Sequence, residues 1–299
     1  MLVFFSGRMN IINPSFDMTN IHIPGSLVSA HWLAENLHAD NLVILDASIK
    51  SVTPAQDEEQ NVPAYIPGAL RFDIDHEMSD ASTPLPHMML PPEVFTEKVQ
   101  NLGINRDSEI VAYDRVGIYS SPRAWCMFRA MGHEQVAVLD GGLPAWMAAG
   151  YETVPALAFP KGRGDFTSQP QRQWFVDSNS VLRALTDPTF TVIDARSEGR
   201  FKGLEPEPRA GLRGGHMPDA VNIPFTSVLE DQKLLSKPKL ELFFEKYKEQ
   251  KMIFSCGSGV TACVVAFAAE QAGHENLSIY DGSWSEWGQP DSGFPVETG

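Results

Sequence analysis

Short apolar runs alternate with stretches of helical periodicity along most of the chain. β-branched and aliphatic residues dominate the apolar runs, which predict buried strands at 42–46, 110–113, 136–139 and 252–254. Apolar residues spaced three and four apart predict helices at about 92–102 and 121–131, and a further helix that begins near Ser26 with this serine as its N-cap. Strands that alternate with helices predict an α/β fold, in which each mainly parallel sheet has helices on both faces.

The pattern of the first half recurs in the second half. Asp46-Ala47-Ser48 is matched by Asp194-Ala195-Arg196. Asp140-Gly141 is matched by Asp281-Gly282, and each pair is followed at the same spacing by a tryptophan. Self-similarity over so long a period indicates tandem copies of one structural unit. We therefore predict an N-terminal extension, a first domain, a linker and a second domain, with the boundaries 1–21, 22–150, 151–174 and 175–299.

The composition constrains partners. The 299 residues are 43% apolar and 20% charged, as in globular proteins, and 23 basic against 38 acidic residues give a formal net charge of −15. This charge disfavours nucleic acids and anionic membranes, and any anionic substrate needs local positive charge. No run approaches the ~20 apolar residues of a membrane helix. The opening residues lack the features of a signal peptide, and Met18 is an alternative start.

The three cysteines are Cys126, Cys256 and Cys263. Their odd number and the absence of C-x-x-C spacing predict neither a disulfide framework nor a zinc site. Cys263 falls within a predicted helix, and we interpret it as a core residue rather than a resolving thiol. Free thiols are typical of a reducing compartment, so we expect a cytoplasmic protein without a metal or other cofactor.

Cys256 is the candidate nucleophile. It lies in the run Ser-Cys-Gly-Ser-Gly-Val-Thr at 255–261, between the strand at 252–254 and an alanine-rich helix at about 264–272. Two glycines let successive backbone N–H groups face inward at the helix N-terminus, which favours an anion such as a thiolate. The alternative is a buried structural cysteine followed by a glycine turn. Asp114 takes the equivalent position in the first copy, which is therefore expected to be non-catalytic.

These features together resemble the rhodanese sulfurtransferases, and the cysteine loop is similar to that of the 3-mercaptopyruvate sulfurtransferases within that family. The similarity extends over about residues 22–290. Besides the tandem copies and the loop, it is carried by Asp194-Ala195-Arg196, Gly215-His216-Met217-Pro218, Asn222-Ile223-Pro224 and Tyr280-Asp281-Gly282-Ser283-Trp284. The resemblance implies two tandem rhodanese-like domains, of which the second is catalytic.

The resemblance also implies a sulfur-transfer reaction. Cys256 takes a sulfur atom from a donor, becomes a persulfide, and passes the outer sulfur to thioredoxin, a small thiol or cyanide. Arg200 and Arg209 bind the carboxylate and keto group of 3-mercaptopyruvate, because a planar guanidinium suits a carboxylate. The loop residues that contact the substrate are Gly257, Gly259, Val260 and Thr261.

Ser258 carries two further implications of the resemblance. An uncharged Gly257-Ser258 pair favours 3-mercaptopyruvate over thiosulfate, because thiosulfate sulfurtransferases of the family hold their dianion with basic residues at these positions. A serine here is also proposed to act in proton transfer with a histidine and an aspartate of the first domain. The matching residues are His87 and Asp75, with His76 as a competing histidine.

Other functions fit parts of the pattern. A cysteine phosphatase has the same order of strand, loop and helix, but it needs an arginine six residues after the cysteine, where this chain has Ala262. A persulfide carrier that serves a protein partner is a second alternative, although Cys256 and both arginines are those of a catalytic site. A thiosulfate sulfurtransferase is the third.

Overall fold

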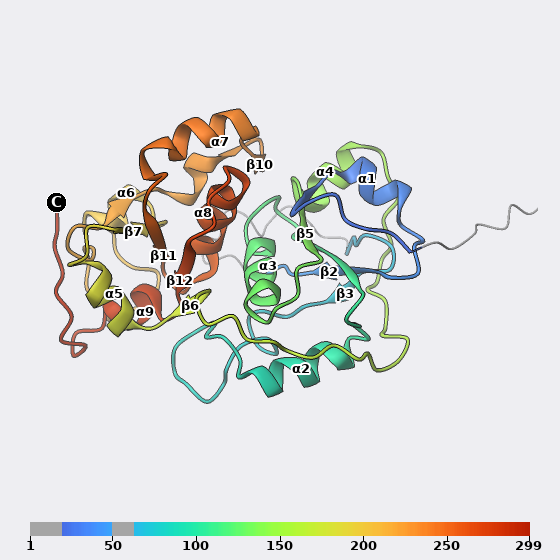
Figure 1. The fold of residues 1–299 in the computed structure, drawn as a ribbon, viewed down its shortest axis with the longest axis horizontal. Helices are drawn as coiled ribbons and strands as arrows, with labels where there is room; N and C mark the ends of the chain where they lie inside the picture. The colour runs from blue at the N-terminus through green and yellow to red at the C-terminus, as the bar shows by residue number, and fades with distance from the viewer. Residues whose placement is uncertain (1–19, 50–62) are drawn as a thin grey trace, which may run out of the picture.

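The computed structural model describes residues 20–49 and 63–299, which form two lobes lying side by side (Figure 1). Each lobe is built on a five-stranded parallel sheet, ordered β1-β5-β4-β2-β3 in the first and β6-β12-β11-β7-β8 in the second. The two orders are equivalent strand by strand. The predicted duplication of one α/β unit is therefore confirmed, whereas residues 1–19 of the predicted extension lie outside the described residues.

The first lobe contains five strands and four helices within the described residues. The strands are β1 (Leu27–Val28), β2 (Leu42–Asp46), β3 (Leu70–Arg71), β4 (Glu109–Tyr113) and β5 (Val136–Leu139). The helices are α1 (Ala30–Glu35), α2 (Pro92–Asn101), α3 (Ser121–Ala130) and α4 (Gly142–Ala148).

The second lobe repeats this order and adds a short antiparallel hairpin. The sheet strands are β6 (Phe175–Val176), β7 (Phe190–Asp194), β8 (Val221–Asn222), β11 (Lys251–Ser255) and β12 (Leu277–Tyr280), and the hairpin strands are β9 (Leu229–Glu230) and β10 (Lys233–Leu234). The helices are α5 (Ser178–Ala184), α6 (Glu198–Phe201), α7 (Lys237–Phe244), α8 (Val260–Gln271) and α9 (Ser283–Trp287), with 3₁₀ turns η2 (Phe225–Val228) and η3 (Glu245–Tyr247). Within residues 20–49 and 63–299, no helix is long and apolar enough to cross a bilayer.

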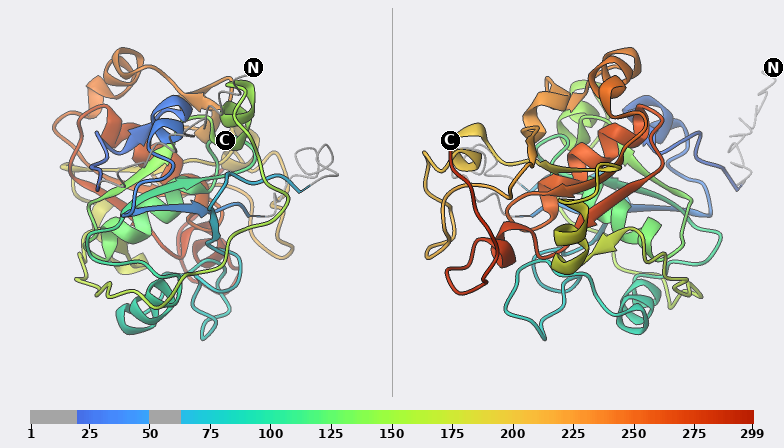
Figure 2. Two further views of the ribbon diagram at one scale, coloured as in Figure 1. Left: turned by 90° about the vertical axis from the view of Figure 1, so that its right-hand side faces the viewer. Right: turned by 60° about the vertical axis from the view of Figure 1, so that its left-hand side comes forward.

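Successive residues of the central strands are buried on opposite faces of each sheet. In β4, Ile110 and Ala112 pack on the side of α2 and α3. Val111 and Tyr113 pack on the other side, with α1 and α4. Helices therefore cover both faces, as Figure 2 shows from two further directions, and strands buried on both faces read as continuous apolar runs.

The two lobes meet along α3 and α8, and one hydrophobic core continues across the junction. Trp125 of α3 is fully buried, with its ring edge-on at 5.0 Å from Phe267 of α8 and 5.2 Å from Trp174. Eight consecutive residues of α8, from Ala262 to Ala269, are buried. A helix that is apolar on every side needs cover on every side. The second sheet supplies one part of this cover and α3 supplies another.

Residues 151–174, predicted as a linker, contain no helix and pack along the first lobe. Val154 forms an antiparallel bridge with Tyr65. Phe166 is 2% exposed, and its ring lies edge-on to those of Phe95 and Phe128. The segment is thus part of the core of the first lobe, while the predicted domain boundaries remain predictions.

The predicted helix beginning near Ser26 is wrong at its start. Leu27 and Val28 form β1, which pairs in parallel with β5. Helix α1 begins later, and its N-cap is Ser29, whose Oγ accepts the N–H of Trp32. The physical reason is that β5 would otherwise be the edge of the sheet with unpaired backbone groups, which the β1 carbonyls satisfy.

We expect Trp125→Ala to weaken the junction between the lobes. Loss of a buried tryptophan leaves a cavity and should lower the free energy of unfolding by about 3–5 kcal/mol. Trp125→Phe is the matched control, because it keeps a ring and the indole Nε1 has no hydrogen-bond partner among the described residues. Urea unfolding followed by tryptophan fluorescence measures both variants. Equal stability of Trp125→Ala and wild type would contradict the role of this contact.

Candidate active site

Cys256 is the first residue after β11 and is only 2% exposed. The loop from Cys256 to Gly259 leads directly into α8, so the predicted order of strand, loop and helix is present. Gly259 has a φ of +77°, in the left-handed region that residues with a side chain rarely adopt. This glycine lets the chain turn within four residues from the strand into the helix.

The carbonyl groups of this loop are held by hydrogen bonds from outside it. The N–H groups of Trp284 and Ser285 donate to the carbonyls of Cys256 and Gly257 at 3.0 and 2.9 Å. Arg123 Nη1 donates to the carbonyl of Gly259 at 3.3 Å. The first N–H groups of α8 have no partner within the helix, so this end can stabilise negative charge on a thiolate or persulfide.

Ser258, His87 and Asp75 form a continuous chain of contacts across the two lobes. Ser258 Oγ lies 2.9 Å from His87 Nδ1, and His87 Nε2 lies 3.1 Å from Asp75 Oδ1. With Asp75 ionised, Nε2 donates to the carboxylate and Nδ1 is left to accept the hydroxyl proton of Ser258. The competing His76 is 75% exposed at its side chain and contacts Asp73 instead.

Arg200 and Arg209 both point to the loop at Gly257. A Cβ placed on Gly257 would lie 3.1 Å from Arg200 Nη2 and 3.6 Å from Arg209 Nη1. Arg209 Nη2 also donates to Ser258 Oγ at 3.3 Å. Among the described residues, Nη1 of each arginine makes no hydrogen bond, and it can therefore reach a bound anion. Gly257 keeps the space between the loop and the arginines open.

Glu207 orients Arg200 and the neighbouring Arg196 from behind. Its side chain is 2% exposed and accepts hydrogen bonds from both Arg196 and Arg200. Arg196 is fully buried, bonded to Asp194 and positioned over the Trp284 ring at 4.0 Å. Arg196 and Arg200 are thus paired with Asp194 and Glu207, whereas Arg209 has no ion pair among the described residues and brings positive charge to the loop of an otherwise acidic chain.

The remaining predicted residues lie at the same end of α8 or beneath it. Val260 is the first helical residue and is buried, while Thr261 beside it is partly exposed. Cys263 and Cys126 are both fully buried, and the Cys263 thiol donates to the Gly259 carbonyl at 3.1 Å. Burial raises the pKa of the Cys126 thiol well above its usual value. Neither thiol is accessible as a second nucleophile.

Comparison with known proteins identifies the family. A model of the rhodanese-like domain matches residues 29–149 and 177–290, most of the chain. The chain belongs to the rhodanese family. Among similar rhodaneses, the 3-mercaptopyruvate sulfurtransferase of Escherichia coli K12 is 39% identical, covering 90% of this chain and 97% of that protein. Thiosulfate/3-mercaptopyruvate sulfurtransferase 1, mitochondrial, of Arabidopsis thaliana is 38% identical, covering 95% of this chain and 81% of that protein.

A solved rhodanese structure agrees with the fold. The crystal structure of SseA from Escherichia coli, described as a 3-mercaptopyruvate sulfotransferase, matches with a TM-score of 0.77 and 35% identity. The match covers 88% of this chain and all of that one. The expectation of two tandem rhodanese-like domains is therefore confirmed.

In the first rhodanese domain, a carboxylate fills the equivalent loop. Asp114 follows β4 as Cys256 follows β11, and its Oδ2 accepts the N–H groups of Tyr119, Ser120 and Ser121 at 3.1, 3.0 and 2.7 Å. The Ser121 hydroxyl donates to the same oxygen. Burial raises the pKa of Asp114 to about 6, and these hydrogen bonds offset the increase only in part. The anion-binding loop of this domain is thus occupied by the protein's own side chain.

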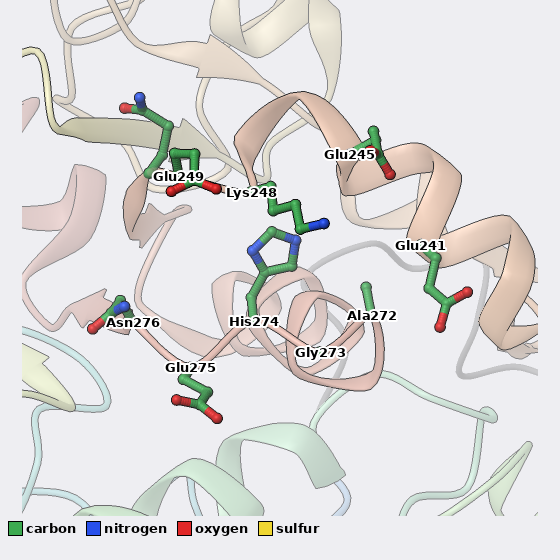
Figure 3. A pocket seen from close by; sticks show the side chains of 10 residues that line it. Glu241, Glu245, Lys248, Glu249, Ala272, Gly273, His274, Glu275 and Asn276 are labelled. Atoms are coloured by element: carbon green, nitrogen blue, oxygen red, sulfur yellow. The ribbon is translucent and has the colours of Figure 1, made fainter.

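A pocket lies at the end of the second rhodanese domain opposite Cys256 (Figure 3). It has a volume of about 560 Å³ and is lined by Glu241, Lys248, Gln250, His274 and Asn276 among others. Gln250 and Asn276 directly precede β11 and β12, so this pocket is at the amino ends of the strands, whereas ligands of such sheets bind at the carboxyl ends. The described residues contain no cluster of His, Cys, Asp and Glu suited to a metal ion.

Inspection of the sequence missed Arg123, Asp281 and Glu207 as site residues. Arg123 is a charged residue in the first turn of a helix whose residues are mostly buried, and nothing in the sequence distinguishes it from Arg129 of the same helix. Asp281 was noted only as part of the repeat and of the run at 280–284 that resembles the family. Glu207 carried no signal, because an acidic residue between two arginines is typical of a solvated loop.

The raised pKa of Asp114 predicts a pH-dependent stability. The folded protein binds a proton that the unfolded chain, with an Asp pKa of ~3.9, has already released, so stability falls as the pH rises. We expect Asp114→Asn to gain up to roughly 2–3 kcal/mol over wild type between pH 4 and pH 6.5. Urea unfolding across this range measures the difference. A difference that does not change with pH would contradict the raised pKa.

Proposed function

We propose that this rhodanese is a 3-mercaptopyruvate sulfurtransferase whose sulfur passes through a persulfide on Cys256. The proposal rests on one observation. The thiol of Cys256, the guanidinium groups of two arginines and a serine hydroxyl that is hydrogen-bonded to histidine all lie at the same loop. The names of the similar proteins support the same donor. Each group has a role that follows from its position.

In the first half-reaction, the Cys256 thiolate attacks the donor sulfur. The S–S bond forms as the C–S bond breaks, and the electron pair of the C–S bond remains on carbon as the enolate of pyruvate. Arg200 and Arg209 hold the carboxylate and the keto oxygen, where this charge develops. The proton of the donor thiol travels to the carbon through Ser258 and His87, with Asp75 stabilising the charged imidazole.

In the second half-reaction, an acceptor thiolate or cyanide attacks the outer sulfur of the persulfide and regenerates the Cys256 thiolate. Inward N–H groups of the loop stabilise both anionic forms. Thioredoxin, a small thiol and cyanide are all chemically competent acceptors. We also propose a cytoplasmic location, in keeping with the three free cysteines; fractionation would test this, because one relative is named as mitochondrial.

The alternative donor, thiosulfate, is less well matched to this loop. It is a dianion without a carboxylate, and Gly257 and Ser258 add no positive charge to that of the arginines. A relative whose name includes both donors keeps thiosulfate as the second candidate. A comparison of kcat/KM for the two donors therefore tests the proposed specificity.

Cys256→Ser should abolish both persulfide formation and turnover. Incubation with 3-mercaptopyruvate and no acceptor should add one sulfur atom to the wild-type peptide that contains Cys256, measured by mass spectrometry. With dithiothreitol present, wild type should release pyruvate over many turnovers, and Cys263→Ser should behave similarly. Stoichiometric persulfide without turnover would indicate a carrier instead, and activity in Cys256→Ser would contradict the assignment.

Arg200→Ala and Arg209→Ala should each weaken use of 3-mercaptopyruvate by about 1.5–3 kcal/mol, the usual value of a charged hydrogen bond. Lys202→Ala is the matched control, because Lys202 follows Arg200 in the same segment but pairs with Glu198 on the surface. Steady-state kinetics should show loss in kcat/KM for the arginine variants and little change for the control. Equal losses in Arg200→Ala, Arg209→Ala and Lys202→Ala would contradict specific binding by the two arginines. Such a result would indicate that any positive charge on this segment has the same effect.

A further inference from the structure

Arg123 connects the non-catalytic rhodanese domain to both parts of the proposed site. It lies on α3, between the lobes in Figure 1, and its side chain is fully buried. Its guanidinium carbon is 4.4 Å from the centre of the Phe175 ring. Burying a charge is costly unless it is paired and hydrogen-bonded. The contacts that Arg123 makes are therefore informative, and they all involve Nη1 and Nη2, since its Nε has no partner among the described residues.

Those contacts go to three separate segments. Nη1 donates to the Gly259 carbonyl in the cysteine loop, and Nη2 donates to the His87 carbonyl and, at 2.9 Å, to Asp281 Oδ1. The other oxygen of Asp281 accepts the N–H of Met89 at 2.7 Å. The pair Arg123–Asp281 therefore holds the His87 carbonyl and the N–H of Met89 and, at the same time, the end of the cysteine loop.

The backbone of His87 needs such support. Its φ is +61°, a left-handed conformation that costs a residue with a side chain of order 1 kcal/mol or more and persists only where the surroundings impose it. Gly259 matches it on the other side, since a Cβ there would lie 2.9 Å from Arg123 Nη1. The guanidinium of Arg123 thus packs directly against Gly259. A larger residue at position 259 would displace the guanidinium.

The equivalent contact in the other half of the molecule has no arginine. Asp140 of the first domain accepts the N–H of Leu234, which follows the turn of the β9–β10 hairpin, at 3.1 Å. This contact mirrors that of Asp281 with Met89, since Asp140 and Asp281 occupy matching positions in the two copies. The hairpin brings no histidine to the first domain, and the cation near Asp140 is Lys233 of the hairpin. Of the two equivalent contacts, the one beside His87 is the one with a buried arginine.

We propose that Arg123 and Asp281 are positioning residues for sulfur transfer, which set His87 against Ser258. This inference rests on the proposed role of His87 in proton transfer. The first domain then acts on the reaction through one buried ion pair, in addition to covering the site. Breaking the pair should leave the arginines that bind the donor in place, so kcat should fall more than the affinity for the donor.

The test is a double-mutant cycle with His87. Arg123→Met and Asp281→Asn, each in the full-length protein, should lower kcat for 3-mercaptopyruvate by about 10- to 100-fold, with a much smaller change in KM. Asn has one acceptor oxygen in place of the two that Asp281 uses for Met89 and Arg123, and it carries no charge to pair with Arg123. In a His87→Ala background, the further loss from Arg123→Met should shrink to about threefold or less, because residues acting through one another are not additive.

Two variants keep the result interpretable. Arg123→Lys retains the charge but cannot bridge all three segments, and it should show an intermediate kcat if Arg123→Met fails to fold. Asp140→Ala removes the acceptor of the equivalent contact without a histidine nearby, and it should lower thermal stability with kcat unchanged. Wild-type kcat in Asp281→Asn and Arg123→Lys, or equal losses with and without His87, would overturn the inference. Wild-type kinetics in His87→Ala would instead overturn the proposed proton transfer itself.

Discussion

The site depends on holding the carbonyl groups of one short loop away from a buried sulfur. In a loop that joins a strand to a helix within four residues, both carbonyl and N–H groups can turn toward the space beside the sulfur. Here Trp284, Ser285 and Arg123 donate to the carbonyls of the cysteine loop, which leaves the N–H groups at the helix end for an anion. Because two of these donors begin α9 and the third comes from the other domain, the loop needs the whole molecule.

The two rhodanese domains cover one another at the carboxyl ends of their sheets. A loop of the first domain carries His87 to the catalytic loop, and the β9–β10 hairpin of the second domain contacts the loop after Asp114, where the Ile118 N–H donates to the Gln232 carbonyl. The interface is thus nearly self-complementary, as in a symmetric dimer. The copies differ in what fills each anion site. The carboxylate of Asp114 occupies one, and the buried thiol of Cys256 lies at the other.

Local charge decides which substrate such a pocket can hold. The chain carries a formal charge of −15, yet Arg196, Arg200 and Arg209 converge where Glu207 and Asp194 neutralise only two of them. Glu207 also fixes Arg200 in one orientation, which reduces the entropy lost on binding. A single carboxylate matches the remaining charge. The proposed preference for 3-mercaptopyruvate therefore depends on the arginines and also on the two carboxylates that pair with them.

The amino-acid sequence by itself determined the duplication and the order of strand, loop and helix around Cys256. These features depend on periodicity and turn chemistry within a few residues, where local propensity is reliable. It misplaced the start of α1, because β1 is stabilised only by pairing with a strand far along the chain. The contact of His87 with Ser258 joins residues 171 positions apart, and Arg123 links three segments of two domains. Such contacts exist only once the lobes have packed, so tertiary structure alone decided them.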